Sequence, residues 1–538
     1  MLFLLWCLAF GDGALDLSFD GDGKVSTPIG ATVDEATVCL LRQNGSIVLG
    51  GYAHNGTDFD FAMVGYLSNG SLDMSFGTGG KVVLDMGGTD KAYAGFIQGD
   101  GKIVLVGESN AGGDIDMAIA RFDSDGTPDM SFDTDAFTLQ DLGQSELAQG
   151  VAGQIDGKIV VGGYTSNGIN WNMVLMRLNL DGSLDECFDT DGVVTASLGA
   201  NSLAQAIHLW NGKILAVGQR GSDVLIARYT SNGQLDLAFD MDGYATTAVA
   251  AISIGKAIAI QHDGRLVVAA TAYGATQYFS AIRYLANGAL DTTFGVAGIA
   301  AVPIQTTDDA RAIALQRDGK ILLAGSTFAG SFYDMALVRL NTNGSLDTSF
   351  DMDGIVVQDF LSTHDVASAV RVQPDGKILA AGHIYLAGNS DFAMARYCSL
   401  TAMTPQRGNA QGLTPLILGG SANCSSMGDT LQWENLTSGF MYPLNQNPIT
   451  VDPILTQTST FRMTVTDPVT MASSSVMVPI LVHDSLIYDW NGDGCNSVAD
   501  IQNAAVFWRQ NYMNDPNGDG WMDIRDYLYI NTDQTVCP

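Results

Sequence analysis

The stretch GALDLSFDGDG, residues 13–23, decides how this chain folds, because six further versions of it follow. They are GSLDMSFGTGG from Gly70, GTPDMSFDTDA from Gly126, GSLDECFDTDG from Gly182, GQLDLAFDMDG from Gly233, GALDTTFGVAG from Gly288 and GSLDTSFDMDG from Gly344. Measured between the Asp of each copy (Asp16, Asp73, Asp129, Asp185, Asp236, Asp291 and Asp347), the spacing is 57, 56, 56, 51, 55 and 56 residues. A fixed period of this length indicates a repeat architecture.

Each repeat holds four pieces that read as strands, for example residues 81–84, 91–98, 102–107 and 116–122. An Asn-Gly or Asp-Gly pair precedes every third piece: Asn44-Gly45, Asp100-Gly101, Asp156-Gly157, Asn211-Gly212, Asp263-Gly264, Asp318-Gly319 and Asp375-Gly376. Such a pair predicts a type I′ hairpin, in which both central residues take a positive φ.

The third pieces are apolar without alternation, as in residues 47–49, 159–161 and 321–323. A strand of this kind is covered on both faces. Small four-stranded sheets stacked around an axis meet that need, so we predict a mainly β fold with a seven-bladed β-propeller over residues 13–398. A β-solenoid is the alternative, although the sequence lacks the polar end caps it requires.

The period, the GxLDxxF phrase and the DGKI turn resemble the delta-60 repeat family of bacterial proteins, over residues 13–398. That resemblance implies a propeller-forming repeat. It implies no particular activity.

Acidic residues dominate the charge, with 58 Asp and Glu against 25 Lys and Arg and a net charge of −33. This balance argues against nucleic acid as a partner, because phosphate binding depends on Lys and Arg. It is compatible with divalent cations, but a solvated acidic surface needs no ligand.

Residues 1–10, MLFLLWCLAF, are apolar and too few to span a bilayer. We predict that residues 1–12 are the remnant of a secretory signal peptide, which implies a secreted or cell-surface protein. A buried first strand is the alternative.

Six cysteines lie beyond that segment and none forms a CxxC pair. Position along the chain favours disulfides joining Cys398 with Cys424 and Cys495 with Cys537. Cys39 and Cys187 are predicted to be buried thiols within repeat strands.

Two positions recur in the fourth pieces. One holds an Arg in six repeats and Gly65 in the other: Arg121, Arg177, Arg228, Arg283, Arg339 and Arg396. The other lies five residues upstream and is usually an Asp: Asp60, Asp116, Asn172, Asp223, Tyr278, Asp334 and Asp391. Because nearly every repeat has them, we expect a structural role such as a buried ion pair. The DxDG elements (Asp20/Asp22, Asp189/Asp191, Asp240/Asp242 and Asp351/Asp353, with Asp133/Asp135 lacking the Gly) are read as self-capped turns, with calcium binding as the alternative.

Residues 399–485 differ in composition and begin with a Pro- and Gly-containing linker. Strand-like segments at 431–434, 449–451, 460–466 and 475–481 predict a small Ig-like β-sandwich.

The strongest chemical signal lies in two loops, residues 489–500 and 515–526. Each places side-chain oxygens at loop positions 1, 3, 5 and 12 and a Gly at position 6, the spacing that wraps ligands around a calcium ion. The backbone carbonyl at position 7 completes the set. We therefore predict two calcium ions.

Residues 486–538, a duplicated loop followed by short helical segments, resemble a type I dockerin. The resemblance implies metal ligands at Asp489, Asn491, Asp493, Cys495, Asp500, Asp515, Asn517, Asp519, Trp521 and Asp526, and a cohesin-like partner. Positions 10 and 11 of the two loops, which help to choose the cohesin in cellulosomal dockerins, are Val498/Ala499 and Ile524/Arg525.

No GxSxG, HExxH or P-loop motif occurs, and the histidines have no repeated spacing. We therefore predict a secreted or surface-attached, non-enzymatic binding or scaffold protein, whose propeller is an interaction disc for a partner such as a cell-surface glycan. The alternative is a secreted carbohydrate-active enzyme with a carboxylate site in the propeller. Unpaired acids at one mouth, at positions that break the sevenfold pattern, would favour the enzyme.

Overall fold

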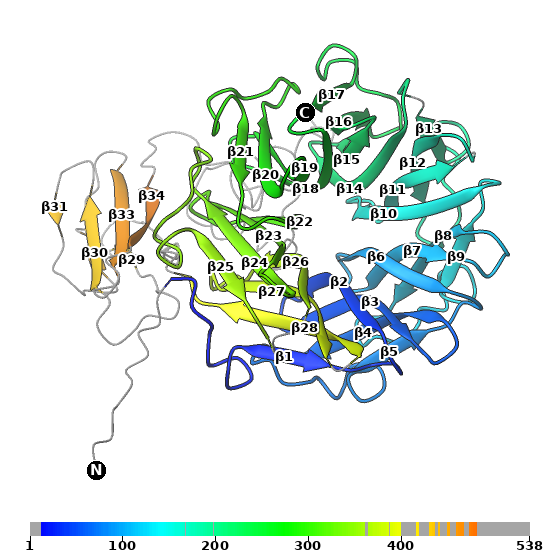
Figure 1. Cartoon of the computed structure of the whole chain (residues 1–538), viewed down its shortest axis with the longest axis horizontal. Helices are drawn as coiled ribbons and strands as arrows, with labels where there is room; N and C mark the ends of the chain where they lie inside the picture. The colour runs from blue at the N-terminus through cyan, green and yellow to red at the C-terminus, as the bar shows by residue number, and fades with distance from the viewer. Residues whose placement is uncertain are drawn as a thin grey trace, which may run out of the picture.

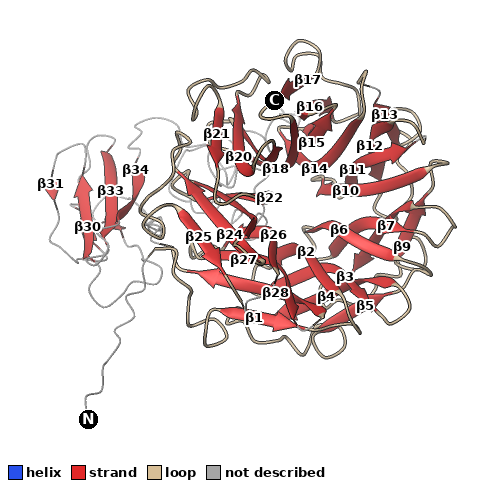
Figure 2. Cartoon of the chain, viewed as in Figure 1, coloured by secondary structure: helices blue, strands red, loops and turns tan. Residues whose placement is uncertain are grey.

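The computed structural model describes residues 12–399, apart from 167, 197, 361–363 and 387, together with six strands between 416 and 480. Residues 12–399 form a closed ring of small sheets around a central axis (Figure 1). Its described residues are strands and loops, with no helix among them (Figure 2). The predicted ring, rather than an open solenoid, is confirmed.

Seven four-stranded antiparallel sheets make the blades. The first strand of each blade is β2 (Asp34–Leu41), β6 (Asp90–Ile97), β10 (Ser145–Gly153), β14 (Ser202–Trp210), β18 (Ile252–Ile260), β22 (Asp308–Leu315) and β26 (Asp365–Val372). The second strands are β3 (Ile47–His54), β7 (Ile103–Ser109), β11 (Ile159–Ser166), β15 (Lys213–Arg220), β19 (Leu266–Tyr273), β23 (Ile321–Phe328) and β27 (Ile378–Leu386).

The third strands are β4 (Phe59–Tyr66), β8 (Asp116–Phe122), β12 (Trp171–Leu178), β16 (Asp223–Thr230), β20 (Gln277–Tyr284), β24 (Tyr333–Leu340) and β28 (Asn389–Tyr397). The fourth strands are β5 (Lys81–Leu84), β9 (Phe137–Gln140), β13 (Val193–Ala196), β17 (Tyr244–Thr247), β21 (Ile299–Val302), β25 (Ile355–Gln358) and β1 (Lys24–Thr27). First strands of adjoining blades contact one another around the axis, while fourth strands form the outer rim (Figure 1).

The ring is closed by the start of the chain. Strand β1 pairs with β28, so the last blade has the order β1-β28-β27-β26, and its outermost strand comes from the N-terminal end of the described chain. Pairing the two ends in one sheet fastens the ring and leaves only the short fourth strands as outer edges. The sequence left this point open.

Apolar packing between blades holds the ring together. Strand β3 is buried along almost its whole length, because its side chains contact both neighbouring blades. Each Val, Leu or Ile side chain buried in this way contributes about 1.5–3 kcal/mol. Tight spacing also requires glycine: a Cβ at Gly107 would lie 1.8 Å from the carbonyl oxygen of Lys91 on the adjacent strand.

The type I′ prediction is wrong for six of the seven hairpins. Asn211 and Gly212 both have positive φ, 49° and 68°, and form the expected two-residue turn. In the other six only the Gly does, and its N–H donates to the carbonyl three residues earlier, as from Gly45 to Arg42. The loops are longer than a two-residue turn, so only one left-handed residue is needed.

The cysteine predictions have a mixed outcome. Cys39 is buried in β2 as predicted, but the prediction for Cys187 is wrong because its side chain is exposed. Cys187 belongs to the turn of the GSLDECF phrase, where the neighbouring Phe188 takes the buried place. Cys398 is disulfide-bonded, and because Cys39 and Cys187 are free its partner lies outside the described residues.

Beyond the propeller the structure describes β29 (Leu416–Leu418), β30 (Thr430–Asn435), β31 (Phe440–Met441), β32 (Ile449–Val451), β33 (Ser459–Thr466) and β34 (Ser473–Ile480). They form a four-stranded sheet in the order β31-β30-β33-β34 and a pair, β29-β32. Four of these strands lie where the sequence predicted them, while the Ig-like sandwich stays a prediction. In the described part of the chain, no helix has the length and apolar character needed to cross a membrane.

Candidate functional site

One face of the ring carries the repeated phrases and the hairpins between first and second strands; we call it the phrase face. Here the recurrent Arg of each third strand pairs with the phrase Asp, and the six Nε to Oδ2 distances run from 2.5 to 2.9 Å. A Lys or Arg from the DGK turn contacts the same Asp, as Lys102 contacts Asp129 at 3.1 Å. The expected structural role of the Arg is thus supported by its contacts.

These pairs also tie each blade to the next. The guanidinium of Arg121 lies 4.7 Å from the ring centre of Phe132. It also donates at 2.5 Å to the carbonyl of Leu180, which lies two residues before the following phrase. Burial alone would raise the pKa of Asp347, but Arg339, Lys320 and Ser349 outweigh it and lower that pKa to about 2.

In the repeat that has Gly65 in place of the Arg, an arginine from a different part of the blade lies over the phrase Phe. Arg42 follows β2, its guanidinium lies 4.9 Å from the ring centre of Phe76, and it donates to the carbonyl of Ser124. Ser124 stands two residues before Gly126, the place that Leu180 has before Gly182. Arg42 therefore makes two of the contacts that the third-strand Arg makes elsewhere, the one with the phrase Phe and the one with a carbonyl of the next blade.

The DxDG elements have the geometry of self-capped turns. The second Asp accepts a bond from the N–H two residues later, as Asp22 does from Lys24 at 2.9 Å and Asp353 from Ile355 at 2.9 Å. The first Asp takes a positive φ, for example 48° at Asp20. Gly77 and Gly295, at 53° and 52°, suit the same place because glycine tolerates that conformation.

The opposite face carries the loops between second and third strands, such as 55–58, and the links from a fourth strand to the next blade, such as 85–89; we call it the loop face. Near this face each first strand contains a β-bulge, since its pairing with the second strand skips one residue in all seven blades. The skipped residues are of six different types: Thr37, Tyr93, Gln149, Gln205, Lys256, Arg311 and Ser368. A bulge redirects a side chain and is common beside functional sites.

Polar and aromatic groups gather around these bulges at the axis. The Tyr52 hydroxyl donates to Glu35 Oε2 at 2.6 Å, and His383 Nδ1 lies 3.9 Å from the same oxygen. Arg311 pairs with Asp309 at 2.8 Å. Burial lowers the pKa of His383 to about 4, and Arg311 adds to this lowering against Glu35, so the imidazole is neutral at pH 7.

Burial also lowers the pKa of Lys256, although the charge of Asp309 opposes the change. Burial raises the pKa of Tyr93, and the neighbouring Glu108 adds to the rise. The axial site is therefore a partly desolvated group of charges of both signs and phenol rings, which are the kinds of side chain that bind ligands.

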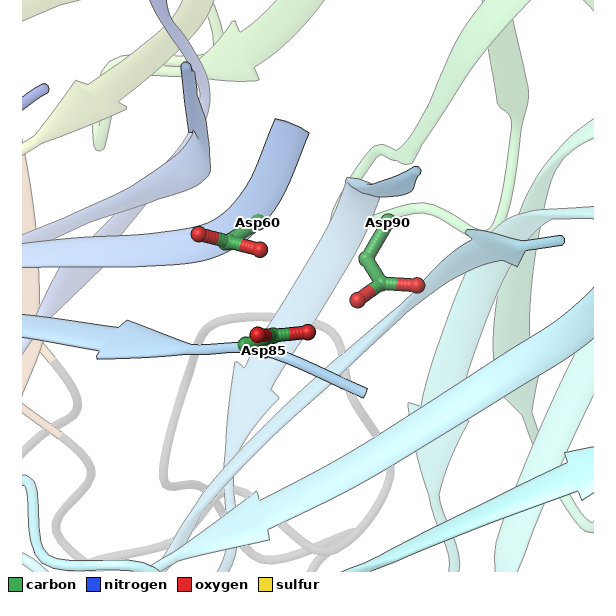
Figure 3. Close-up of side chains that lie close together, drawn as sticks. All are labelled: Asp60, Asp85 and Asp90. Carbon is green, nitrogen blue, oxygen red and sulfur yellow. The ribbon is translucent and has the colours of Figure 1, made fainter. Parts of the chain in front are cut away.

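The loop face also holds three carboxylate clusters at blade junctions. They are Asp60 with Asp85 and Asp90, Asp114 with Asp116 and Asp141, and Asp334 with Asp359 and Asp365, and within each cluster one oxygen per residue lies within 4.8 Å of the others. Figure 3 shows the carboxylates of the first cluster turned toward one another. Asp60, Asp116 and Asp334 are the upstream partners of the recurrent Arg in sequence, yet they lie on the face opposite to it. The shared structural role predicted for them is therefore not seen in their contacts.

The predicted calcium ligands, from Asp489 to Asp526, all lie outside the described residues. The axial residues were not among the predicted ones, although a signal for them exists. Six of the seven bulged residues stand between two Ala or Gly residues, as Tyr93 does between Ala92 and Ala94, whereas Thr37 stands between Ala36 and Val38. The flanking residues thus form a repeated pattern whose middle member varies. A variable residue inside an otherwise constant pattern is what a binding position would show.

A family described as "Domain of unknown function (DUF5122) beta-propeller" matches seven segments: residues 42–76, 98–132, 154–188, 211–239, 261–294, 316–350 and 373–398. The chain is a β-propeller repeat protein. None of the curated proteins matches this propeller protein in sequence.

Three solved structures illustrate the similarity of fold. An ulvan lyase, bound to a GlcA- and Rha3S-containing saccharide, has 10% identity and a TM-score of 0.39, covering 69% of this chain and 95% of its own. The polysaccharide lyase Uly1 has 11% identity and a TM-score of 0.42, covering 68% and 90%. Sqt1 of Chaetomium thermophilum, bound to the N-terminus of ribosomal protein L10, has 13% identity and a TM-score of 0.37, covering 72% and 94%.

The prediction that this propeller protein is not an enzyme is contradicted by the two lyases, and we do not keep it. They are enzymes among the structures that resemble it in fold. At 10% and 11% identity they identify neither a reaction nor a substrate for this chain.

Proposed function

We propose that this β-propeller repeat protein acts outside the cell by binding a glycan at the axial opening of its loop face. The observation that carries the proposal is the set of seven β-bulges, which present six different residue types beside the axis of an otherwise repetitive ring. The bulged residues give the innermost strands of the ring a set of side chains without sevenfold symmetry. Such a set suits a ligand that itself has no sevenfold symmetry.

The chemistry of the axial site fits a saccharide. The phenol rings of Tyr52 and Tyr93, with ring centres 6.4 Å apart, give apolar faces for sugar rings. Gln149 and Gln205 offer amide donors and acceptors for hydroxyl groups. The cations Lys256 and Arg311 can pair with acidic groups of a cell-surface glycan.

A glycan array probed with the full-length chain tests this. Tyr93→Ala and Lys256→Ala should each weaken binding at least about tenfold, the usual loss when a central contact of a binding site is removed. Met241→Ser is the matched control, because Met241 is 90% exposed in a phrase on the opposite face. Equal binding by all four proteins would refute the axial site.

A second candidate is a carbohydrate-active enzyme at the same place. The observation that favours it is the close grouping of three groups that can transfer protons, the Glu35 carboxylate, the Tyr52 hydroxyl and the neutral His383 imidazole. Tyr52→Phe removes only the hydroxyl oxygen. If the chain cleaves a polysaccharide that it binds, this variant should keep binding and lose at least about a hundredfold in rate.

We further propose that residues 486–538 form a calcium-folded, dockerin-like module that attaches the protein to a cohesin-like partner. The support is the spacing of oxygen ligands from Asp489 to Asp500 and from Asp515 to Asp526. Because residues 12–399 contain no helix in their described part, a calcium-induced gain of helical circular dichroism in the full chain would come from elsewhere. Asp500→Ala with Asp526→Ala should abolish the gain, and its absence from the native chain would remove the proposal.

A further inference from the structure

The junction between the first and second blades brings together three carboxylates that the axial site does not use. Asp60 lies near the start of β4, Asp85 directly follows β5, and Asp90 is the first residue of β6. One oxygen of each lies within 4.8 Å of the others, around a shared space (Figure 3). We propose that this cluster is a calcium site that joins the two blades.

Two of the three side chains are buried and each has an oxygen without a partner. Asp60 is 2% exposed and Asp90 0% exposed, and the Oδ1 atom of each accepts no hydrogen bond. Their Oδ2 atoms are held, Asp60 by the Asn55 amide at 2.9 Å and Asp90 by the Met86 N–H at 2.7 Å. One oxygen thus orients each carboxylate and the other is left for a cation, as in metal sites with an outer hydrogen-bonded shell.

The electrostatics of the cluster call for positive charge. Burial raises the pKa of Asp90 to about 6, and the charges of Asp60 and Asp85 add to the rise. Burial likewise raises the pKa of Asp60, with Asp85 and Asp58 adding to it, while Asn55 and His54 oppose it. Buried like charges this close are costly unless a cation balances them.

At the neighbouring junction, a lysine of this protein places a positive charge near the corresponding buried acids. Between the seventh and first blades, Asp391 and Asp34 take the places of Asp60 and Asp90, and Pro28 takes that of Asp85. There the ammonium of Lys81 donates to the Pro28 carbonyl at 2.7 Å, and its charge opposes the rise that burial causes in the pKa of both acids. The residue equivalent to Lys81 at the proposed site is Phe137, the first residue of β9, which brings no charge.

A third junction holds only one of the three acids, and hydrogen bonds occupy both oxygens of that carboxylate. At Asp308, the equivalent of Asp90, Tyr278 and Pro303 replace the remaining acids. Asp308 Oδ1 accepts from the Thr327 hydroxyl at 2.6 Å and Oδ2 from the Ile304 N–H at 2.8 Å. At this junction both oxygens of the buried Asp accept hydrogen bonds, whereas Oδ1 of Asp60 and of Asp90 accepts none.

Calcium suits the spacing. Its oxygen ligands lie at about 2.3–2.6 Å, so two ligands of one ion are at most about 4.6–5.2 Å apart, whereas magnesium allows only about 4.0–4.2 Å. The three oxygens lie within 4.8 Å of one another, which is inside the span that a calcium ion can bridge. Asp85 is exposed, which gives the ion a way in and lets water complete its coordination.

Equilibrium dialysis of calcium with the full-length chain tests the site. Asp60→Asn with Asp90→Asn should lower the number of bound ions by one, because Asn keeps an oxygen acceptor but removes both charges. Asp223→Asn is the matched control, since Asp223 holds the place of Asp60 at a junction where Ala248 and Ser253 replace the other acids. Any calcium ions bound by residues 486–538 are bound equally by all of these variants. The difference in the number of bound ions between wild type and variant therefore does not depend on whether that module binds calcium.

Asp85→Asn provides a second arm, because this exposed residue keeps the bond that it accepts from the Gly87 N–H. It should weaken calcium binding at the site at least about tenfold. The same number of ions and the same affinity in wild type, the double variant and Asp85→Asn would overturn the proposal. A loss of one ion in Asp223→Asn as well would also overturn it.

Discussion

Replacing Arg121 with Ala tests whether the repeated ion pairs hold neighbouring blades together. The change removes the 2.6 Å bond to Asp129, the 2.5 Å bond to the Leu180 carbonyl in the next repeat, and the contact with Phe132. Asp129 is left buried with Lys102 at 3.1 Å as its remaining cation. Breaking a buried pair by removing one partner costs about 3–5 kcal/mol.

The expected shift in melting temperature follows from the size of the ring. Unfolding entropy is about 2.1 cal/mol/K per residue, which for about 390 residues gives roughly 0.8 kcal/mol/K. A loss of about 4 kcal/mol therefore lowers the melting temperature by about 5 °C at pH 7. Circular dichroism of the strand signal during heating measures it.

A control and a pH series sharpen this test. Arg317→Ala removes an exposed arginine and should change the melting temperature by no more than about 1 °C. Hydrogen bonds and the cations Lys102 and Arg121 hold the pKa of Asp129 below its usual value in spite of burial. The stability from that pair is thus complete above about pH 4 and is lost as the pH falls toward the lowered pKa, so wild type and Arg121→Ala should converge in acid. A melting temperature for Arg121→Ala within about 1 °C of wild type at pH 7 would refute the reasoning.

Three further outcomes are expected. Arg42→Gln removes the cation over Phe76 and should cost about 1–3 kcal/mol in urea unfolding, whereas a loss under about 0.5 kcal/mol would show that Arg42 does not replace the missing third-strand Arg. Gly107→Ala forces a Cβ against the Lys91 carbonyl and should leave little folded protein in the soluble fraction; normal yield and melting would contradict the packing. Burial, with nearby acids, raises the pKa of Asp365 to about 7, so its ionisation costs stability increasingly as the pH rises from about 4 to 7. In the absence of divalent cations, Asp365→Asn should therefore raise the melting temperature more at pH 8 than at pH 4. An equal rise at both pH values would show that the pKa of the Asp365 carboxyl is not raised.

Strand positions were predictable because they follow local rules. The apolar runs 47–49 and 159–161 lie in β3 and β11, and alternating residues 460–466 lie in β33. Turn type was predicted less well, since an Asn-Gly or Asp-Gly pair does not set the length of its loop. Cys187 shows a similar limit, because the side of a turn that faces solvent depends on which neighbour, here Phe188, fills the core.

The candidate sites were harder to predict because their residues are distant in sequence. The axial group combines Glu35, Tyr52, Arg311 and His383 from the first, sixth and seventh blades. Within a single strand, β8, the acid at its start belongs to the loop face and the recurrent Arg near its end belongs to the phrase face. The alternation of polar and apolar residues along a strand does not show on which face of the ring a residue lies. It also does not show which charged residues of the next blade lie beside it.

The sequence by itself determined the number of repeats, the strands and the phrase that recurs between them. The period can be counted along the chain, and apolar runs and glycines specify strands and turns within a few residues. Only the tertiary structure decided that β1 completes the last blade, that the bulged residues surround one axis, and that Asp60, Asp85 and Asp90 meet at a junction. The physical reason is that closing the ring brings separate strands within a few ångströms of one another. Burial and mutual charge then act on the acids at that junction, and neither can be read from their order along the chain.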